Sequence, residues 1–593
     1  MKGPRVRIME FMSIRYFRGG ILLAAACCAG AWAQQYNIST VAGTGGAPGF
    51  ADGNALLTAL LSSPASIALD PKNSGNLYIA DSVNHRIRLL TGGNVTTVAG
   101  TGSAGWAGDG ASATSAELNF PEGIAVDSTG NLYIADTGNH VIRKVDTTGN
   151  ITTIAGTGGQ SGAIGDNGPA TSAQLSLPSA VALDSSGNIY IADTGNSEIR
   201  KIVGTNMFCV LGCGTTGGSL ANPRALAVDA TGAIYIADTE QHSVVKYSGV
   251  TRTVLAGTGN IGFSGDGGQA VNAQFDTPEG LAMDAAGYVY ISDSFNGRVR
   301  KILKDGTIET IAGTGNGVVT YSGDGGPATA ASLYFPRGLA VDGQGNVYVS
   351  DTVNAVIRLL TPVYPAINAG GVANSASGAT TLAPGSLATV YGSYLASSTA
   401  KASAPLPTTL GEVSVSVNGV AAPISYVSST QVNFQVPWST QTGPATVTVS
   451  QAGGAGNTVT VPVAAAAPGL FVTSAGAAVA QNYPSYSLNT SSNPIAAGGT
   501  IVAYLTGIGA VLPAGAIADG AATPASPIFN SALGCGATIG GITAQVGFVG
   551  MTPGYAGLAQ ANITVPAGVK SGSNPLIVTC NGQASNAAAI SVK

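Results

Sequence analysis

Charge is scarce in this sequence. Of 593 residues, 24 are Lys or Arg and 29 are Asp or Glu, so charged residues make up 9% of the chain, against about a quarter in an average soluble domain. If the first 33 residues are removed, five basic residues and one acidic residue are lost, which leaves 19 basic and 28 acidic residues. The remaining basic residues form no cluster in the sequence. This balance argues against nucleic acid and anionic lipid as partners.

Motifs of catalysis are also missing. The chain has three histidines, no Gly-x-Ser-x-Gly sequence, no phosphate-binding loop and no Cys/His set at metal-ligand spacing. The sequence therefore favours binding over catalysis. Paired carboxylates for glycoside hydrolysis stay open as an alternative, because two aspartates from different repeats can come close in a fold.

Long apolar runs are absent, except near the start. Arg15 and Arg18 precede the apolar run 21–29, and a small-x-small sequence ends at Ala33. This run is far short of the ~20 residues that a membrane-spanning helix needs. We expect residues 1–33 to be a signal peptide, and the protein to be exported to the periplasm, the cell surface or the medium.

Cysteines are few, and four follow the signal segment. In an exported protein an even number suggests disulfides, and we expect the pairs Cys209–Cys213 and Cys535–Cys580. A lipoprotein signal ending at Cys27 or Cys28 is an alternative to the simple signal peptide.

What is abundant is repetition. The phrase GNLYIADTGNHVIRKVD (130–146) is one of six similar copies, whose central aspartates are Asp81, Asp136, Asp193, Asp238, Asp293 and Asp351. Each copy follows a short apolar run such as GIAVD (123–127) and precedes an Ile-Arg or Val-Arg run and a Thr-rich run such as NITTIAGTG (150–158). Four strands per unit, at a period of 45 to 58 residues between aspartates, predict the blades of a β-propeller.

The ends of the repeat region predict how the ring closes. The sixth repeat lacks the Thr-rich fourth strand, and the missing copy, TVAGTG, stands at 40–45 before any other strand. A fourth strand supplied by the N-terminus would complete the last blade and remove the free sheet edges. We therefore predict an all-β chain with a six-bladed propeller over 36–361.

The repeated phrase resembles NHL repeats, a family of six-bladed propellers. Asn84-His85, Asn139-His140 and Asn354-Ala355 stand where the family has its Asn and His, and repeat four departs most, with Glu240-Gln241-His242. The resemblance implies the fold and says little about activity, because the family includes protein-binding, RNA-binding and lyase members.

Six equivalent aspartates cannot all serve one active site. We interpret them as turn residues whose carboxylates accept hydrogen bonds from backbone N–H groups two or three residues later. Zinc-binding lyases of the NHL group use converging histidines, so a metal site at His85, His140 and His242 is the alternative. Their equivalent positions in different repeats argue against it.

Long inserts separate the fourth strand of one repeat from the first strand of the next. They contain an aromatic or apolar residue shortly before an aspartate, as in GWAGDG (105–110) and GFSGDG (262–267), and repeat four lacks the insert. The candidate ligand-binding residues of these loops are Phe50, Asp52, Trp106, Asp109, Asp166, Phe263, Asp266, Tyr321 and Asp324.

Three interpretations of the inserts remain open. The aromatic and acidic side chains can bind a sugar or a peptide, and carboxylates with exposed carbonyls can bind Ca²⁺. The structural interpretation is that Asp-Gly forms a turn while the aromatic ring fixes the loop on its own blade. The near-identity of the inserts favours the structural interpretation.

After residue 365 the composition shifts to Ala, Ser, Thr, Gly and Val. The segment QVNFQVPW (431–438) resembles QANITVPA (560–567), and short alternating runs with frequent turns predict two Ig-like β-sandwiches, 365–467 and 468–593. NGVAAPISYVSSTQVNFQVPW (418–438) resembles an uncharacterised IPT/TIG-like module of exported soil-bacterial proteins. We expect Phe434 and Trp438 to be core residues.

The function predicted from the sequence is binding. We expect an exported binding or scaffold protein whose propeller loop face binds an extracellular protein or glycan, with the Ig-like pair as spacer or tether. The alternative is an extracellular lyase or hydrolase, with or without a metal. The sequence specifies no cofactor and no oligomeric state.

Overall fold

The structure is a computed structural model that describes residues 35–593 apart from 214–219, 250, 316–320, 397 and 452–453. The expected signal peptide, 1–33, lies outside the described residues. The described residues form two compact units, the first ending at Val363 and the second beginning at Tyr364. Among the described residues there are strands and short 3-10 turns, and no helix long and apolar enough to span a bilayer.

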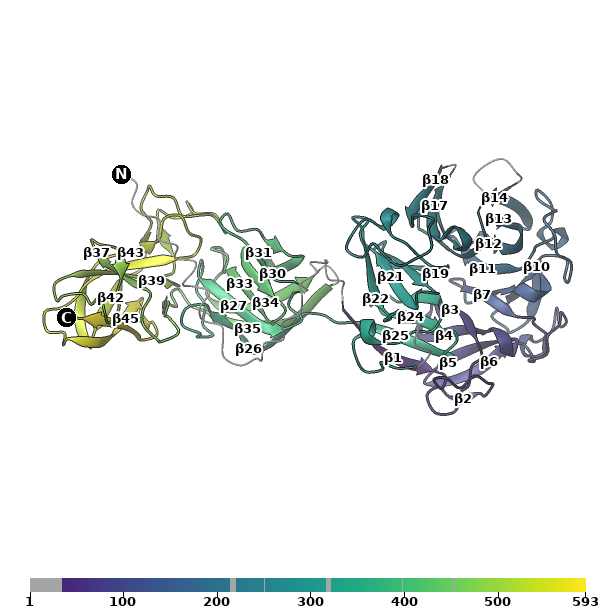
Figure 1. Cartoon of the computed structure of the whole chain (residues 1–593), viewed down its shortest axis with the longest axis horizontal. Coiled ribbons are helices and arrows are strands. Elements are labelled where there is room, and N and C mark those ends of the chain that lie inside the picture. The colour runs from purple at the N-terminus through teal and green to yellow at the C-terminus, as the bar shows by residue number, and fades with distance from the viewer. Residues whose placement is uncertain (1–34, 214–219, 250, 316–320, 397, 452–453) are drawn as a thin grey trace. The chain divides into compact units, whose positions relative to one another are not determined.

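The first unit is a six-bladed propeller, as predicted (Figure 1). Each blade is an antiparallel sheet with four main strands. The strands of blades 1 to 3 are β3 (Pro64–Asp70), β4 (Asn73–Asp81), β5 (Arg86–Thr91) and β6 (Asn94–Ala99); β7 (Pro121–Val126), β8 (Leu132–Asp136), β9 (Val141–Val145) and β10 (Ile151–Ala155); and β11 (Pro178–Leu183), β12 (Ile189–Asp193), β13 (Glu198–Val203) and β14 (Asn206–Leu211). The short β2 (Gly53–Asn54) adds to β6.

Blades 4 to 6 repeat the arrangement. Their strands are β15 (Pro223–Val228), β16 (Ile234–Asp238), β17 (Ser243–Ser248) and β18 (Thr251–Ala256); β19 (Pro278–Met283), β20 (Val289–Asp293), β21 (Arg298–Ile302) and β22 (Ile308–Ala312); and β23 (Pro336–Val341), β24 (Val347–Asp351), β25 (Val356–Pro362) and β1 (Tyr36–Ala42). The N-terminal strand β1 pairs with β25, with Tyr36 opposite Pro362, so the predicted closure is confirmed.

Neighbouring blades share hydrophobic cores. Ile142 of blade 2 and Val181 of blade 3 belong to one buried cluster, and equivalent clusters fill the other interfaces. The second strand of a blade is buried on both faces, as the fully buried β8 shows. This explains why these strands have a continuous apolar sequence such as LYIAD.

The second unit contains two hydrophobic cores, which match the two expected sandwiches. The strands around the first core are β26 (Ala366–Asn374), β27 (Leu387–Ser393), β28 (Ala400–Lys401), β29 (Thr409–Leu410), β30 (Val413–Val417), β31 (Val420–Ala422), β32 (Ile424–Ser428), β33 (Gln431–Gln435), β34 (Gly443–Gln451) and β35 (Gly454–Val463). Phe434 is fully buried in it.

The strands around the second core are β36 (Gly469–Leu470), β37 (Ala480–Tyr483), β38 (Ser487–Leu488), β39 (Thr500–Thr506), β40 (Val511–Leu512), β41 (Asn530–Ser531), β42 (Cys535–Ile539), β43 (Ile542–Met551), β44 (Ala559–Thr564), β45 (Gly572–Cys580), β46 (Gln583–Ala584) and β47 (Ala588–Val592). The long β43 pairs with β42 at one end and with β44 at the other, so it passes from one sheet to the next.

Hydrogen bonds join the two sandwiches. The amide of Gly520 donates to Gln435 Oε1 at 2.7 Å, and that of Leu387 donates to Thr506 Oγ1 at 2.8 Å. Trp438 is partly buried and packs against the second core, although it belongs to the segment that forms the first sandwich. Its indole lies where residues of both sandwiches meet, against Gly385.

Both expected disulfides are present. Cys209 and Cys213 join β14 to the connection that follows it, and Cys535 and Cys580 join the paired strands β42 and β45.

Candidate functional site

Each insert aspartate binds a buried arginine of its own blade. In blade 2, Arg143 is fully buried, and its Nη2 lies 2.7 Å from Asp109 Oδ1 while its Nη1 lies 3.4 Å from Asp136 Oδ2. The same arrangement recurs in four other blades, with insert-aspartate distances between 2.5 and 2.9 Å. The Asp–Arg–Asp sets are Asp52–Arg88–Asp81, Asp109–Arg143–Asp136, Asp166–Arg200–Asp193, Asp266–Arg300–Asp293 and Asp324–Arg358–Asp351.

The insert aromatics also pack on their own blades. The Phe50 ring lies 3.8 Å from Arg86 Cζ, and the Phe263 ring lies 3.7 Å from Arg298 Cζ, within cation–π range. Trp106 Nε1 donates to Thr153 Oγ1 at 3.2 Å. Tyr321 donates to Asp324 and has its ring 4.8 Å from Arg358 Cζ. This geometry supports the structural interpretation of the inserts.

The repeated turn aspartate links three segments of its blade. Asp136 Oδ1 accepts the N–H of Asn119, which precedes β7, and Oδ2 accepts Asn139 Nδ2 and Arg143 Nη1. The backbone donor comes from an earlier segment, so the expected bonds from amides two or three residues later are wrong. The carboxylate therefore fixes the start of the first strand as well as the turn after the second.

Burial raises the pKa of four of these turn aspartates to about 6. For Asp136 the amide of Asn119, the Asn139 side chain and the Arg143 guanidinium each act in the opposite direction. The other three are Asp193, Asp293 and Asp351. At neutral pH these carboxylates remain ionised beside their arginines.

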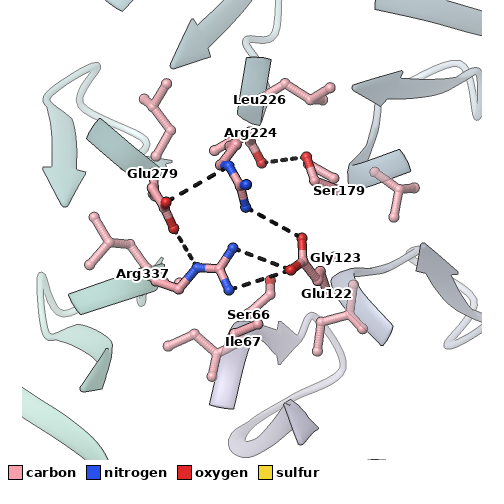
Figure 2. A pocket seen from close by; sticks show the side chains of 18 residues that line it. Ser66, Ile67, Glu122, Gly123, Ser179, Arg224, Leu226, Glu279 and Arg337 are labelled. Carbon is pink, nitrogen blue, oxygen red and sulfur yellow. Dashed lines mark hydrogen bonds and ion pairs between the residues drawn. The ribbon is translucent and has the colours of Figure 1, made fainter. Parts of the chain in front are cut away.

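The sequence predictions missed a ring of charged side chains in the central channel. The first strands of all six blades line a cavity there, and their second residues include two glutamates and two arginines (Figure 2). Arg337 lies between both glutamates, with Nε 2.5 Å from Glu279 Oε2 and Nη2 3.4 Å from Glu122 Oε1. Arg224 lies 3.8 Å from Glu122 and 3.7 Å from Glu279. Glu122, Arg224, Glu279 and Arg337 form what we call the channel ring.

The channel ring has balanced charges. Burial alone would lower the pKa of Arg337, but Glu122 and Glu279 raise it on balance, so the arginine keeps its charge. Small residues follow the ring positions, and a Cβ on Gly280 would come within 1.7 Å of Arg337 O. The strands therefore approach closely around the channel, which holds the four charged side chains together.

Exposed apolar side chains surround the mouth of this channel. The residue before each first-strand proline has a positive φ, between 46° and 58°, in all six blades. This conformation is disfavoured for a non-glycine residue before proline. Phe120 and Leu177 occupy two of these positions, and Val83, Phe295 and Val353 lie on the neighbouring turns. All five side chains are exposed. Phe295 packs edge-to-face on Phe335 of the next blade, with ring centroids 4.5 Å apart.

We call this set the mouth rim. Its members are the exposed Val83, Phe120, Leu177, Phe295 and Val353 and the half-buried Phe335. The turn of a blade is hydrogen-bonded to the segment before that blade's first strand, as from Val83 N to Ser62 O and from Val353 N to Tyr334 O. The rim is interrupted at blade 4, where Asn222 Nδ2 donates to Glu240 Oε1.

One signal in the sequence could have revealed both features. The first strands begin SPAS, FPEG, LPSA, NPRA, TPEG and FPRG, so the residues on either side of an invariant proline change while the rest of the phrase is kept. Where repeats are otherwise alike, the positions that differ are the ones that can distinguish a ligand.

Comparisons with known proteins agree with this architecture. Family models match as follows: the teneurin NHL domain at residues 91–164 and 259–322, the NHL repeat at 175–202 and 220–247, and the IPT/TIG domain at 375–463. The chain is an NHL-repeat propeller with a C-terminal Ig-like module. It is similar to teneurin-3 of Mus musculus, with 30% identity over 340 residues that cover 51% of this chain and 11% of teneurin-3.

Two solved structures also resemble the NHL propeller. One is a structural genomics protein of unknown function from Bacteroides thetaiotaomicron, with 21% identity and a TM-score of 0.44, covering 55% of this chain and 76% of the other. The second is an auxiliary nutrient binding protein from the same organism, with 16% identity and a TM-score of 0.43 over the same shares. The chain spans about a ninth of the length of teneurin-3.

The histidines of the NHL repeats join neighbouring blades. Nδ1 of His85 accepts the N–H of Phe120, and Nδ1 of His140 accepts that of Leu177, at 3.1 and 3.0 Å. His242 binds Thr277 N in the same way at 3.2 Å. An Nδ1 that accepts must be unprotonated, so the ring is neutral with its proton on Nε2. Each histidine serves a different blade interface, which opposes a shared metal site.

The insert carboxylates also fit a cation poorly. One group of possible ligands among the described residues is Asp166, Glu198 and Cys209. Cys209 is in a disulfide, and the Arg200 guanidinium already lies 2.8 Å from Asp166. Ca²⁺ would have to displace a buried arginine from each insert, and this opposes the expected Ca²⁺ alternative.

Proposed function

We propose that the propeller is an exported binding module whose ligand is a protein segment that docks on the mouth rim. The observation that supports this best is the position of the exposed apolar side chains. They surround the channel mouth at positions where the six repeats differ from one another. Contiguous exposed apolar side chains with polar neighbours are typical of protein interaction sites.

The channel ring offers polar groups that a ligand on the mouth rim can contact. Arg224 keeps 29% of its side chain exposed, and its two ion pairs are longer than 3.5 Å. Its N–H donors are thus available to a carbonyl or carboxylate of a ligand that enters the mouth. The Ig-like pair, joined by buried hydrogen bonds, is suited to act as a spacer.

Catalysis by a lyase or hydrolase has less support. The three histidines accept backbone amides, and both channel glutamates are paired with arginines. Among the described residues, this leaves neither an accessible His Nδ1 nor an unpaired glutamate in the channel for acid–base chemistry.

Panning a random-peptide library on the full chain tests the proposal. We expect enrichment of apolar peptides whose affinity falls at least about tenfold, or 1.4 kcal/mol, in the variant Phe120→Ser/Phe295→Ser. The control Val203→Ser/Val254→Ser removes two side chains of similar exposure away from the rim and should bind within about twofold. Peptides that bind the rim variant as well as the wild type, or a glycan array with rim-dependent ligands and no peptide binding, would refute the proposal.

A further inference from the structure

The second sandwich has almost no charge. Residues 468–593 contain only Asp519, Lys570 and Lys593 as charged side chains. Charged peptides, nucleic acid and anionic polymers therefore find few complementary groups on this sandwich. A ligand of this part of the chain must be recognised through apolar contacts and neutral hydrogen bonds.

One face of β39 turns away from the main core. Ile501, Ala503 and Leu505 are fully buried in that core, so the alternate residues Thr500 and Tyr504 lie on the opposite face. Strand register places Tyr483 of β37 beside Thr500.

The same register extends this face onto β44. Gln560 lies beside Tyr504, and Asn562 lies beside Val502. Both amides are half-buried, while Ala559, Ala561 and Ile563 of β44 point into the core.

A small apolar layer supports this face. Val479, Val502, Tyr504 and Leu558 form a buried cluster against which Phe471 and Tyr555 pack. Tyr504 donates its O–H to Gln481 Oε1 at 2.7 Å. Burial, with Tyr555 and Tyr486 acting in the same direction, raises the pKa of Tyr504 to about 12.

Two tyrosines at the edge of this face are exposed. Tyr483 and Tyr486 have 53% and 46% of their surface accessible, and their rings meet edge-to-face with centroids 5.6 Å apart. We call Tyr483, Tyr486, Gln560 and Asn562 the tyrosine platform.

The loop that presents Tyr486 is held by amide side chains. Tyr486 N donates to Asn482 O, and Asn489 Nδ2 donates to Asn482 Oδ1 at 2.9 Å. Asn493 Nδ2 donates to Ser487 Oγ and Leu488 O, each at 2.8 Å. A loop fixed in this way loses little conformational entropy when a ligand binds.

The first sandwich has the amide pair in a more buried setting. Gln431 Nε2 donates to Asn433 Oδ1 at 2.7 Å, as Gln560 Nε2 does to Asn562 Oδ1 at 3.2 Å. Gln431 is buried, whereas Gln560 is half-buried. The amide pair is therefore part of the sheet in both sandwiches. In the first sandwich it lies beside the half-buried Tyr391 and Tyr426. The second sandwich differs in having two exposed tyrosines, Tyr483 and Tyr486, at the edge of the face that carries the pair.

We propose that the tyrosine platform binds a neutral polysaccharide chain. Tyrosine rings offer flat apolar faces for the C–H groups of a sugar, and amide groups both donate to and accept from sugar hydroxyls. The near absence of charge selects a neutral chain over a charged one. This inference is independent of the mouth rim and gives the Ig-like pair a role beyond that of a spacer.

Affinity electrophoresis of the full chain tests the inference, with hydroxyethylcellulose, xyloglucan or galactomannan in the gel. We expect at least one of these polymers to retard the wild type, and the variant Tyr483→Ala/Tyr486→Ala to lose affinity at least about tenfold. The variant Tyr483→Phe/Tyr486→Phe keeps the ring faces and should bind within about threefold.

The matched control is Tyr394→Ala, which removes a tyrosine of similar exposure from the first sandwich and should not change the retardation. Polygalacturonate, a charged polymer, should not retard the wild type. Calorimetry of the alanine variant should show an unchanged unfolding transition, so that its loss of binding can be assigned to the tyrosine rings. Retained binding by this variant overturns the inference. Failure of all three neutral polymers to retard the wild type overturns it equally, whatever the outcome at the mouth rim.

Discussion

Blade 4 differs from the other five blades in two respects at once. It lacks the insert before its first strand, and it has the buried Val245 where the other blades have their buried arginine. Its turn aspartate, Asp238, still accepts the amide of Ala221, but its cation is Arg252 from the fourth strand, at 3.3 Å and 30% exposed.

The paired loss shows what the inserts do. In blade 2 the Arg143 guanidinium donates to the insert's Asp109 carboxylate, to the carbonyls of Ala107 and Glu117 and to Asp136. A buried guanidinium needs such partners. Without the insert, the described residues of blade 4 provide no equivalent set of acceptors, and an apolar side chain takes the position. The insert and the arginine therefore form one structural unit.

The largest effect is expected from Arg143→Leu. It leaves Asp136 buried without its cation, and removing one partner of a buried ion pair destabilises by about 3–5 kcal/mol. The free energy of unfolding by urea can be followed through the fluorescence of Trp106, with Trp438→Phe as common background. The control Arg252→Leu in blade 4 should lose less, about 1–2 kcal/mol, because Arg252 is 30% exposed and water can take its place beside Asp238. Equal losses in the two blades would contradict the comparison.

A smaller effect is expected from Asp109→Asn. The Asp109 carboxylate is 42% exposed, and loss of a charge-assisted hydrogen bond at such a site destabilises by about 1–2 kcal/mol. Limited proteolysis should show faster cleavage within 102–117 than in the wild type. Unchanged cleavage would mean that the arginine does not hold the insert in place.

The smallest effect concerns pH. Burial lowers the pKa of His85 and His140 below the ordinary value, with Arg86 contributing at His85. A lowered pKa in the folded state means that the stability contributed by the group is present above about pH 6.5 and is lost as pH falls through the folded value. The Tm of the wild type should therefore fall more between pH 7.5 and 5.5 than that of His85→Ser/His140→Ser. Serine is chosen because Ser197 stands at the equivalent position of blade 3.

The comparison between the two proteins isolates the histidines. The turn aspartates act in the opposite sense, because their raised pKa values give stability that is lost as pH rises through about 6. These aspartates are the same in the wild type and in the double variant, so their contributions cancel when the two pH dependences are compared. A double variant with the same pH dependence as the wild type would show that the bonds to Phe120 and Leu177 do not depend on histidine ionisation.

The sequence was sufficient to predict the closed propeller but not the ion pairs within its blades. The displaced TVAGTG at 40–45 predicted the pairing of β1 with β25, because a closed ring leaves no other partner for that strand. The insert aspartates stand out in the sequence as candidates, but the sequence pattern does not pair them with their arginines. Arg143 lies 34 residues from Asp109 in the chain, and only the packed blade brings the two together.

The channel ring and the tyrosine platform show a similar limit. Glu122 and Arg337 are 215 residues apart and meet only because six first strands surround one axis. Tyr483 and Gln560 share one face only through the register of β37, β39 and β44, and Tyr486 joins them through its ring contact with Tyr483. The sequence alone determined the all-β class, the six-fold repeat, its closure and the disulfide pairs, because these depend on periodicity and local pairing. The tertiary structure decided which charges are buried, which are paired and which side chains remain exposed, because these depend on contacts between residues far apart in the chain.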